Sequence, residues 1–510
     1  MQAFLNYMTK RILQKFLTFF YKNFITLLNF ISVKKQYRYM KKFLTTTNIR
    51  GLLTPEELLS GNFGFEKEGL RIDQKGNLSI TPHPDVFGNK LKNPYITTDF
   101  SESQVEIVTP TFNSLKEAYQ CLTFLVDIVN TAIPNDQYIW NQSLPCILPD
   151  KYMIPLAEYE GKKGEESRDY RINLAKKYGT KKQMISGIHY NFSIDEKTIQ
   201  KLYSNYEKED ISYKNFKNEI YLKITRNYLR LKWLIIYLTG ATPSAHKTFT
   251  KECIDLMKNF DGIDSFYSKE GVSFRNSSIG YKNLLALYPR YDNIRNFIND
   301  VKSFIEEGNL SEAKELYTQI RLKPKDPTQY LESLLETGIL YLEVRSIDIN
   351  PFDKCGISLV DAEFVHLFLI YLLLKEESEY EKWQSEGVYN EEIIAEEAFN
   401  PDILLLKDGE NIKIKEWANE ILNDIEELDN IFELKKENII EIMRERVNNP
   451  KKTYSKQLVD IIENKGFIAS QTSIAIHNKE TSFESIDLET IRNNEKLLDY
   501  YTHSLPKIRL

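Results

Sequence analysis

Short segments in which apolar and polar residues alternate constrain the fold of this chain more than any other feature of its sequence. In FGFEKEGLRID (63–73), Glu66 and Glu68 stand two residues apart. Residues i and i+2 of a β-strand face the same side, so both carboxylates are expected on one face of a strand. Like charges side by side repel each other unless a cation lies between them or one carboxyl binds a proton. A solvent-exposed strand edge with scattered charges is the other interpretation of this pair.

The same alternation recurs in three later segments, YITTDFSESQVEIVTP (95–110), ISGIHYNFS (185–193) and YLEVRSIDINPF (341–352). Their polar positions are Asp99, Glu102, Glu106, His189, Asn191, Ser193, Glu343 and Arg345. Asp99 and Glu106 are an odd number of residues apart, so on one regular strand their side chains would face opposite sides. They can meet only if a bend or bulge lies between them, and FSES can provide it. A core histidine and a simple ion pair between Glu343 and Arg345 are the structural alternatives.

If these strands form one sheet, its polar face carries a dense group of potential metal ligands. The group consists of Glu66, Glu68, Asp99, Glu106, His189 and Glu343. Hard divalent cations prefer oxygen ligands, and Mg²⁺ typically binds through a few carboxylates together with phosphates of a substrate. We therefore expect several Mg²⁺ ions, with Mn²⁺ as the alternative metal, and a phosphate-bearing substrate whose charge Arg345 can contact.

Several common nucleotide-binding and catalytic motifs do not occur in the chain. The sequence contains no G-x-x-x-x-G-K-[ST] and no G-x-G-x-x-G after a strand, and it contains no G-x-S-x-G or kinase motif set. A P-loop enzyme is therefore excluded. The net charge of −6 over 510 residues gives no basic surplus for a nucleic-acid partner. Four cysteines without C-x-x-C spacing favour free thiols in a reducing cytoplasm.

The order of periodic segments predicts an α+β fold in which an antiparallel sheet is interrupted by helices. Strands are expected at about 60–110, 183–195 and 339–350, and helices at 114–132, 197–239, 284–316 and 327–337. After residue 356 the pattern is mostly helical, and LFLIYLLL (367–374) is too short to span a membrane, so it indicates a buried helix.

The N-terminal segment differs from the rest, since residues 1–55 contain no Asp or Glu and are rich in Phe, Leu and Lys. One interpretation is a basic amphipathic helix that rests on a membrane. The interpretation that we favour is an extension outside the working protein, dispensable before Met40. The expected organisation is an extension at 1–52, a catalytic core of sheet and helices at 53–360, and a mainly helical part packed on that core at 361–510.

Six segments together resemble bacterial glutamate–cysteine ligase of the γ-proteobacterial type, in order and in spacing, from about residue 53 to beyond 360. They are GFEKEGLRI, ITTDFSESQVEIVTP, YRINLAKKYGTKKQMISGIHYNFS, ITRNYLRLKWLIIYLTGATP, SFRNSSIGY and YLEVRSIDINPF. The resemblance implies a glutamine-synthetase-like antiparallel sheet that forms an active-site trough. It also implies ATP-dependent joining of the γ-carboxylate of L-glutamate to the amino group of L-cysteine through γ-glutamyl phosphate, the first step of glutathione biosynthesis.

The resemblance assigns roles to individual positions. Glu66, Glu68, Asp99, Glu106, His189 and Glu343 match metal-site positions, and Arg345 matches an arginine that stabilises the transferred phosphoryl group. Positions lining the cysteine pocket are matched by Phe100, Tyr170, Arg171, Tyr281 and Tyr317, and those holding glutamate by Gln183, Asn191 and Arg275. One departure is Thr180, where the family often has arginine. No second ligase domain follows, so the bifunctional glutathione-synthesising fusion is not expected.

Two other functions stay open at this level. The first is a related carboxylate–amine ligase that shares the metal trough but uses another amine. The second is a non-catalytic, membrane-associated protein that binds divalent ions, which the basic apolar N-terminus suggests.

Overall fold

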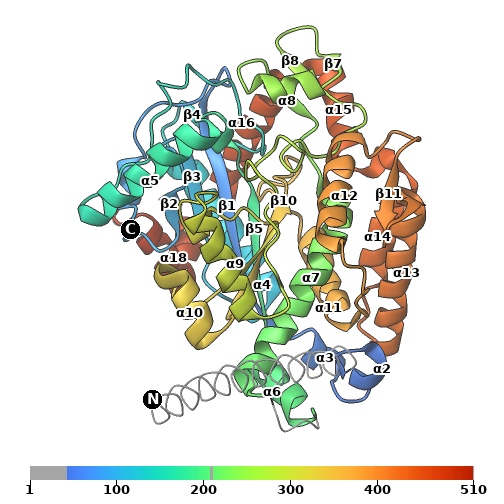
Figure 1. Ribbon diagram of the computed structural model, residues 1–510. Coiled ribbons are helices and arrows are strands. Elements are labelled where there is room, and N and C mark those ends of the chain that lie inside the picture. The colour runs from blue at the N-terminus through green and yellow to red at the C-terminus, as the bar shows by residue number, and fades with distance from the viewer. Residues whose placement is uncertain (1–42, 207–210, 509–510) are drawn as a thin grey trace, which may run out of the picture.

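A seven-stranded antiparallel sheet forms the centre of the fold, in the order β2-β3-β1-β5-β10-β9 with β4 paired to β1 (Figure 1). The computed structural model describes residues 43–206 and 211–508. The strands of this sheet are β1 (Gly61–Asp73), β2 (Ile96–Thr98), β3 (Gln104–Val108), β4 (Gln137–Trp140), β5 (Ile188–Ile194), β9 (Ile320–Lys323) and β10 (Tyr341–Ile347). A mixed fold of helices around an antiparallel sheet confirms the predicted α+β class.

Alternation along the strands gives the sheet one apolar and one polar face, as the sequence predicts. The apolar face carries Phe65, Val105, Ile107, Tyr190, Phe192, Leu342 and Val344, all of them buried. Three helices cover this face: α4 (Leu115–Ala132) contacts β1 and β3, α7 (Tyr213–Thr239) contacts β10 and β9, and α11 (Leu359–Leu374) lies against both helices. The polar face is left to form the wall of a cavity.

Serine caps set where these three covering helices begin. Ser114, Ser212 and Ser358 each accept a hydrogen bond from the backbone N–H three residues further on. Such a cap satisfies one of the backbone donors that the first turn of a helix leaves unpaired. Almost every residue of α11 is buried, which confirms that LFLIYLLL forms a buried helix.

The other elements surround this core. The remaining α-helices are α2 (Thr46–Ile49), α3 (Pro55–Leu58), α5 (Lys162–Tyr178), α6 (Glu196–Ser204), α8 (Lys251–Leu256), α9 (Ile294–Glu306), α10 (Tyr330–Thr337), α12 (Trp383–Glu397), α13 (Ile414–Phe432), α14 (Glu437–Asn448), α15 (Tyr454–Lys465), α16 (Phe467–Ser485), α17 (Leu488–Asn493) and α18 (Glu495–Ser504). Two small sheets consist of β6 (Ser244–His246), β7 (Asn259–Phe260) and β8 (Ser265–Tyr267), and of β11 (Leu404–Lys407) and β12 (Glu410–Lys413).

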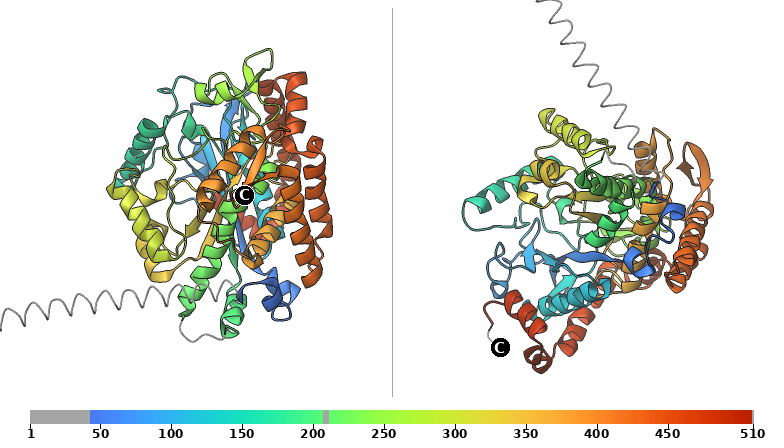
Figure 2. Two further views of the ribbon diagram at one scale, coloured as in Figure 1. Left: turned by 45° about the vertical axis from the view of Figure 1, so that its right-hand side comes forward. Right: turned by 90° about the horizontal axis from the view of Figure 1, so that it is seen from below.

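The C-terminal helices pack on the core from two sides. α13 and α14 lie side by side along one flank, and α11 contacts both of them (Figure 1). α16 and α18 instead pack against α4, and Figure 2 shows these dark red helices beside it. The larger of two buried hydrophobic clusters includes residues from both ends of the described chain, from Leu44 to Leu505.

The structure differs from the expectation at several elements. Residues 95–110 form two strands of a hairpin, in which Thr97 pairs with Glu106, so the bend or bulge that was expected at FSES is a complete reversal of the chain. The predicted helix at 284–316 is shorter, because α9 starts only at Ile294 and a 3-10 turn (Ala313–Glu315) follows it. The region 197–239 contains two helices, α6 and α7, and the helix α5 and the short strands β4 and β9 were not predicted.

Residues 43–53 lie against the helical core. Leu44 and Ile49 are fully buried, Leu53 is nearly so, and the Phe43 ring contacts Tyr206 and Phe216. The packed part of the chain thus includes residues ahead of the predicted boundary at 52/53. Residues 1–42, to which the predictions about the extension refer, lie outside the described residues. Within the described part of the chain, no helix is long and apolar enough to cross a membrane.

Candidate active site

The strand register places acidic and basic side chains in one row across the polar face. Glu68 pairs with Glu106 between β1 and β3, and Glu66 pairs with His189 between β1 and β5. On the next strand, Glu343 of β10 pairs with Asn191 of β5. Residues directly opposite on antiparallel strands point to the same side. The row therefore brings together residues that lie up to 277 positions apart in the sequence (66 and 343).

These side chains line a cavity of about 320 Å³ that opens on the polar face of the sheet. Of the residues predicted for the site, the lining contains Glu66, Glu68, Asp99, Phe100, Glu106, Tyr170, Arg171, Gln183, His189, Arg275, Tyr281, Tyr317, Glu343 and Arg345. Asn191 is not among the lining residues, but its Nδ2 donates a 3.0 Å hydrogen bond to Glu66 Oε1. The fold thus gathers the predicted side chains in one place, while their individual roles stay predictions.

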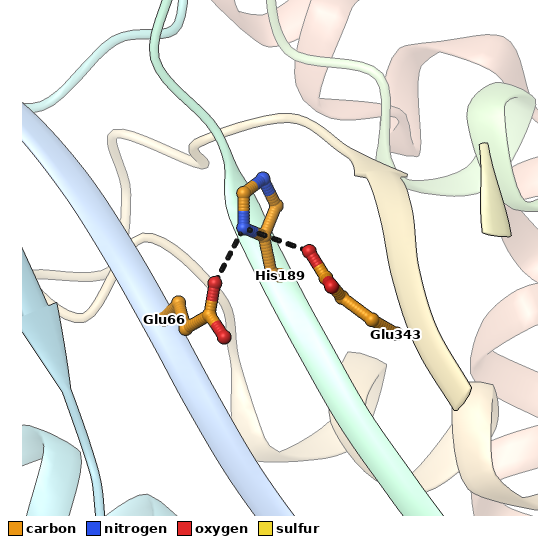
Figure 3. Close-up of side chains that lie close together, drawn as sticks. All are labelled: Glu66, His189 and Glu343. Atoms are coloured by element: carbon orange, nitrogen blue, oxygen red, sulfur yellow. Dashed lines mark hydrogen bonds and ion pairs between the residues drawn. The ribbon is translucent and has the colours of Figure 1, made fainter. Parts of the chain in front are cut away.

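Glu66, His189 and Glu343 form the tightest group of potential metal ligands in the described residues (Figure 3). His189 Nδ1 lies 2.8 Å from Glu66 Oε2 and 3.5 Å from Glu343 Oε1. One ligand atom from each residue lies within 4.8 Å of the others. Burial lowers the pKa of His189, and the nearby Arg345 adds to this effect. A neutral imidazole between two carboxylates is suited to bind a cation.

Glu68 and Glu106 lie beside this group, and burial together with neighbouring carboxylates disfavours the charged form of both side chains. Burial and the neighbouring Asp99 raise the pKa of Glu68 to about 8. The pKa of Glu106 is raised well above its usual value by burial, by Asp99 and by the other carboxylates. The backbone N–H of Gly187 donates a 2.8 Å hydrogen bond to Glu68 Oε2. A bound cation would remove the repulsion that raises both values.

Glu343 is held as a carboxylate by the cations around it. It is 1% exposed, and burial alone would raise its pKa. Arg345 and Lys323 outweigh burial and hold the pKa well below its usual value. The Arg345 guanidinium bonds Glu343 Oε1, and Lys323 Nζ lies 2.6 Å from Oε2. The ion pair predicted as the structural alternative therefore exists, and it lies inside the cavity.

Aromatic residues also line the cavity. The rings of Tyr281 and Tyr317 stack with centroids 4.6 Å apart, and Tyr281 Oη donates a 3.3 Å hydrogen bond to Gln183 Oε1. Arg171, on α5, donates a 2.8 Å hydrogen bond from Nε to the carbonyl of Asp99. Arg171 therefore braces the turn that carries Asp99, a role that the sequence did not reveal.

Arg275 is buried next to Gly187, and its guanidinium occupies the space that a side chain at residue 187 would need. A Cβ at residue 187 would lie 2.2 Å from Arg275 Nη2, so a side chain there would displace the guanidinium. Within the described residues, Arg275 Nε and Gln183 Nε2 are buried donors without a hydrogen-bond partner. Buried polar atoms are rarely left unpaired, so these donors point to a polar ligand in the cavity.

Several lining residues were missed by sequence reasoning. Thr318, Gln319, Arg321 and Lys323 belong to β9 or to the residues just before it, and Lys314 lies in the 3-10 turn that precedes them. The signal for β9 is a single alternation of four residues, IRLK, in which Arg321 and Lys323 share a face. A run this short does not distinguish a strand from a loop.

Comparison with known proteins gives consistent matches. A family model described as glutamate-cysteine ligase matches residues 52–311 and 305–393. The Glutathione biosynthesis bifunctional protein GshAB of Clostridium perfringens is 40% identical over 446 residues, which are 85% of this chain and 57% of that protein. Its counterpart from Listeria monocytogenes is 40% identical over 417 residues, 81% of this chain and 53% of that protein. The chain thus spans about half the length of these curated relatives.

Two solved structures share the fold. Glutamate–cysteine ligase from Francisella tularensis, crystallised in complex with AMP, gives a TM-score of 0.78 at 27% identity and covers 88% of this chain and 95% of its own. A bifunctional glutathione synthetase from Pasteurella multocida gives a TM-score of 0.77 at 29% identity, covering 89% of this chain and 57% of its own.

Proposed function

We propose, because this chain belongs to the glutamate–cysteine ligase family, that it joins L-glutamate to L-cysteine with the hydrolysis of ATP. A γ-carboxylate oxygen of glutamate attacks the γ-phosphorus of ATP, and ADP leaves. The cysteine nitrogen then attacks the carbonyl carbon of the γ-glutamyl phosphate and loses a proton, and inorganic phosphate departs. The product is γ-glutamylcysteine.

One observation carries the proposal: carboxylates, a neutral histidine and arginines converge on a cavity whose lining also includes aromatic side chains. Phosphoryl transfer between anions requires positive charge at the reacting groups and exclusion of water. The second substrate requires a neighbouring pocket of different chemistry. The lining of this one cavity includes both charged and aromatic side chains.

The acidic side of the cavity fits a group of hard divalent cations. We assign Glu66, Glu68, Asp99, Glu106, His189 and Glu343 to hold them, and we propose Mg²⁺ with Mn²⁺ as the alternative. Support comes from the raised pKa of Glu68 and Glu106, because burial and neighbouring carboxylates raise both pKa values and a bound cation would offset that effect. Such ions would neutralise the charge of a triphosphate.

Arg345 is the candidate for contact with the phosphoryl group during transfer. Its guanidinium is fully charged, since the nearby Glu343 raises its pKa against the opposing effect of burial. A planar fork of donors can contact two phosphoryl oxygens at once. Because charge builds up on these oxygens as the γ-phosphorus moves, the contact would be strongest in the transition state.

The remaining lining residues are assigned to the two amino acids. Gln183 and Arg275 have unpaired donors, and together with Asn191 we assign them to glutamate. We assign a second set of lining residues to cysteine: Phe100, Tyr170, Arg171, Tyr281 and Tyr317. The AMP complex of the Francisella relative supports a nucleotide in a fold of this kind. We further propose a cytoplasmic enzyme without a nucleic-acid or membrane partner.

An assay of phosphate release tests the proposal. With ATP, Mg²⁺, glutamate and cysteine present, phosphate should appear in step with γ-glutamylcysteine, and the rate should fall to background when glutamate or Mg²⁺ is omitted. Replacing cysteine by serine, alanine or 2-aminobutyrate distinguishes the amine specificity. Equal rates with all amines would favour a related carboxylate–amine ligase, and no release under any condition would refute the proposal.

A further inference from the structure

Three segments far apart in the sequence carry four of the residues that we assign to cysteine. Tyr170 and Arg171 belong to α5. Tyr281 lies between β8 and α9, and Tyr317 lies between the 3-10 turn at 313–315 and β9. Neither Tyr281 nor Tyr317 belongs to a helix or a strand, so contacts between the segments must fix where the two rings lie.

The carboxylate of Glu315 joins the 3-10 turn to the end of α5. Its side chain is fully buried, and its Oε1 accepts hydrogen bonds from Lys177 Nζ and from the Tyr178 hydroxyl. The backbone N–H of Ser311 donates a 2.6 Å hydrogen bond to Oε2. Burial alone would raise the pKa of Glu315, but these hydrogen bonds, led by that from Lys177, hold it below its usual value. The carboxylate is therefore charged, and its hydrogen bonds are of the stronger, charge-assisted kind.

Asn283 ties the third segment to the same point. Its Nδ2 donates hydrogen bonds of 3.0 Å to the Tyr178 hydroxyl and of 2.8 Å to the backbone carbonyl of Glu315. Its Oδ1 accepts a 2.8 Å hydrogen bond from the backbone N–H of Tyr317. Because Asn283 stands two residues after Tyr281, its amide connects the segment of Tyr281 to the other two segments.

Tyr178, Asn283 and Glu315, which we call the junction, lie behind the aromatic lining of the cavity. The ring of Tyr178 packs on that of Tyr317 with centroids 5.4 Å apart, and Tyr317 in turn packs on Tyr281. None of the three junction residues occurs among the described residues that line the cavity. The junction therefore contacts the residues of the pocket and not the space for a substrate.

We propose that the junction positions Tyr281 and Tyr317 for cysteine and so sets the affinity of the enzyme for that substrate. The inference rests on the proposed function, since it presumes that cysteine binds beside these rings. A pocket whose side chains are already fixed binds its ligand without the cost of ordering them. Loosening the junction should therefore weaken the binding of cysteine. Glutamate and ATP, which we assign to other lining residues, should bind as before.

Steady-state kinetics of Tyr178→Phe test the inference. The substitution removes the hydroxyl at the centre of the junction but keeps the ring that packs on Tyr317. The KM for cysteine should rise by about fivefold or more, as expected when a hydrogen bond to a buried carboxylate is lost. The KM values for glutamate and ATP should change by less than about twofold, because their contacts are not altered. Asn283→Ala, at a half-buried position, should give the same pattern.

Tyr371→Phe is the matched control. The Tyr371 hydroxyl donates a 2.9 Å hydrogen bond to Asp424 Oδ2, so this variant also removes a hydroxyl bonded to a carboxylate, but between α11 and α13. It should leave all three KM values unchanged. An unchanged KM for cysteine in both Tyr178→Phe and Asn283→Ala, or equal rises in all three KM values, would overturn the inference. A wild-type chain that forms no γ-glutamylcysteine would instead contradict the proposed function.

Discussion

The sequence predicts that Arg345 and Glu343 contact each other, but it does not decide whether the pair is structural or catalytic. Residues two positions apart on one strand face the same side, so their side chains are expected to contact each other. In the structure, Arg345 Nη1 donates a hydrogen bond to Glu343 Oε1. The strand alone does not say whether the pair faces solvent or a cavity. Burial decides this, because Glu343 is 1% exposed and both residues line the cavity.

Arg345→Lys distinguishes a catalytic contact from a structural ion pair. We expect kcat to fall by about 100-fold or more, as when one preorganised donor is removed, while the KM for ATP changes much less. Lysine keeps the charge beside Glu343 but cannot form a bidentate contact. Steady-state kinetics at saturating glutamate and cysteine provide the measurement.

Arg492→Lys, at an exposed position of α17, is the control for this substitution and should leave both constants unchanged. A raised KM for ATP with normal kcat would make Arg345 a ground-state contact of the nucleotide. Wild-type values of kcat and KM would mean that the pair has a purely structural role. Ion pairs in that role contribute about 0–1 kcal/mol to stability when they are exposed.

Glu68→Gln tests the acidic side of the cavity. The substitution keeps the size of the side chain but removes an anionic ligand, so turnover should fall by orders of magnitude. The fold should persist, because the amide resembles the protonated carboxyl that the raised pKa of Glu68 favours. In thermal melts, Mg²⁺ should stabilise the wild type more than the variant.

Glu165→Gln, at an exposed position of α5, is the matched control. It should keep both turnover and the stabilisation by Mg²⁺. If Glu68→Gln turned over at the wild-type rate with saturating Mg²⁺, Glu68 would be an ordinary buried carboxyl rather than a metal ligand.

At the scale of elements, the long alternating strands could be predicted from the sequence and the short ones could not. β1, β5 and β10 each carry several alternating positions, which fix both the strand and its polar face. β4 and β9 have four residues each and become strands only through pairing with longer neighbours. The hairpin of β2 and β3 was not predicted. A tight turn between two short strands leaves the alternation of apolar and polar residues almost unchanged, so the sequence does not show where the chain reverses.

A buried ion pair joins the C-terminal helices to the core. Arg446 of α14 bonds Asp361 of α11, and both contact the Tyr454 hydroxyl of α15. Removing one partner of a buried pair leaves the other charge uncompensated. Arg446→Ala should therefore lower the free energy of unfolding by about 3–5 kcal/mol, measured by urea denaturation.

Arg444→Ala, two residues earlier on the same helix, is the control. Arg444 pairs with the half-exposed Glu426, so its loss should cost about 1 kcal/mol or less. Equal losses in the two variants would mean that the C-terminal helices do not depend on the buried pair for their attachment.

At the scale of the whole molecule, the sequence identifies the segments of the site but not the cavity that they form. Glu66, His189 and Glu343 come from strands β1, β5 and β10, and only the strand order places them side by side. The alternation alone grouped them only on the condition that their strands form one sheet, and the resemblance to a known family then assigned them to one metal site. Gly187 escaped notice, and so did the contact of Arg171 with the Asp99 carbonyl, because both depend on contacts across the fold.

Two N-terminal truncations separate the extension from the packed core. A chain that starts at Met40 should keep its turnover and melting temperature. A chain that starts at Thr54 loses Leu44, Ile49 and Leu53, whose burial contributes about 1.5–3 kcal/mol each, and should melt at a clearly lower temperature. Loss of turnover in a folded chain that starts at Met40 would show that the extension takes part in the reaction.

The fate of the glutamate oxygens tests the proposed reaction most directly. Glutamate labelled with ¹⁸O in its γ-carboxylate should transfer one labelled oxygen to each phosphate released, because the oxygen that attacks ATP leaves with the phosphate. Mass spectrometry of the phosphate and the nucleotide after complete turnover provides the measurement. One ¹⁸O per phosphate and none in the nucleotide is the predicted result. Unlabelled phosphate, or label in AMP, would contradict a γ-glutamyl phosphate and with it the proposed chemistry of the cavity.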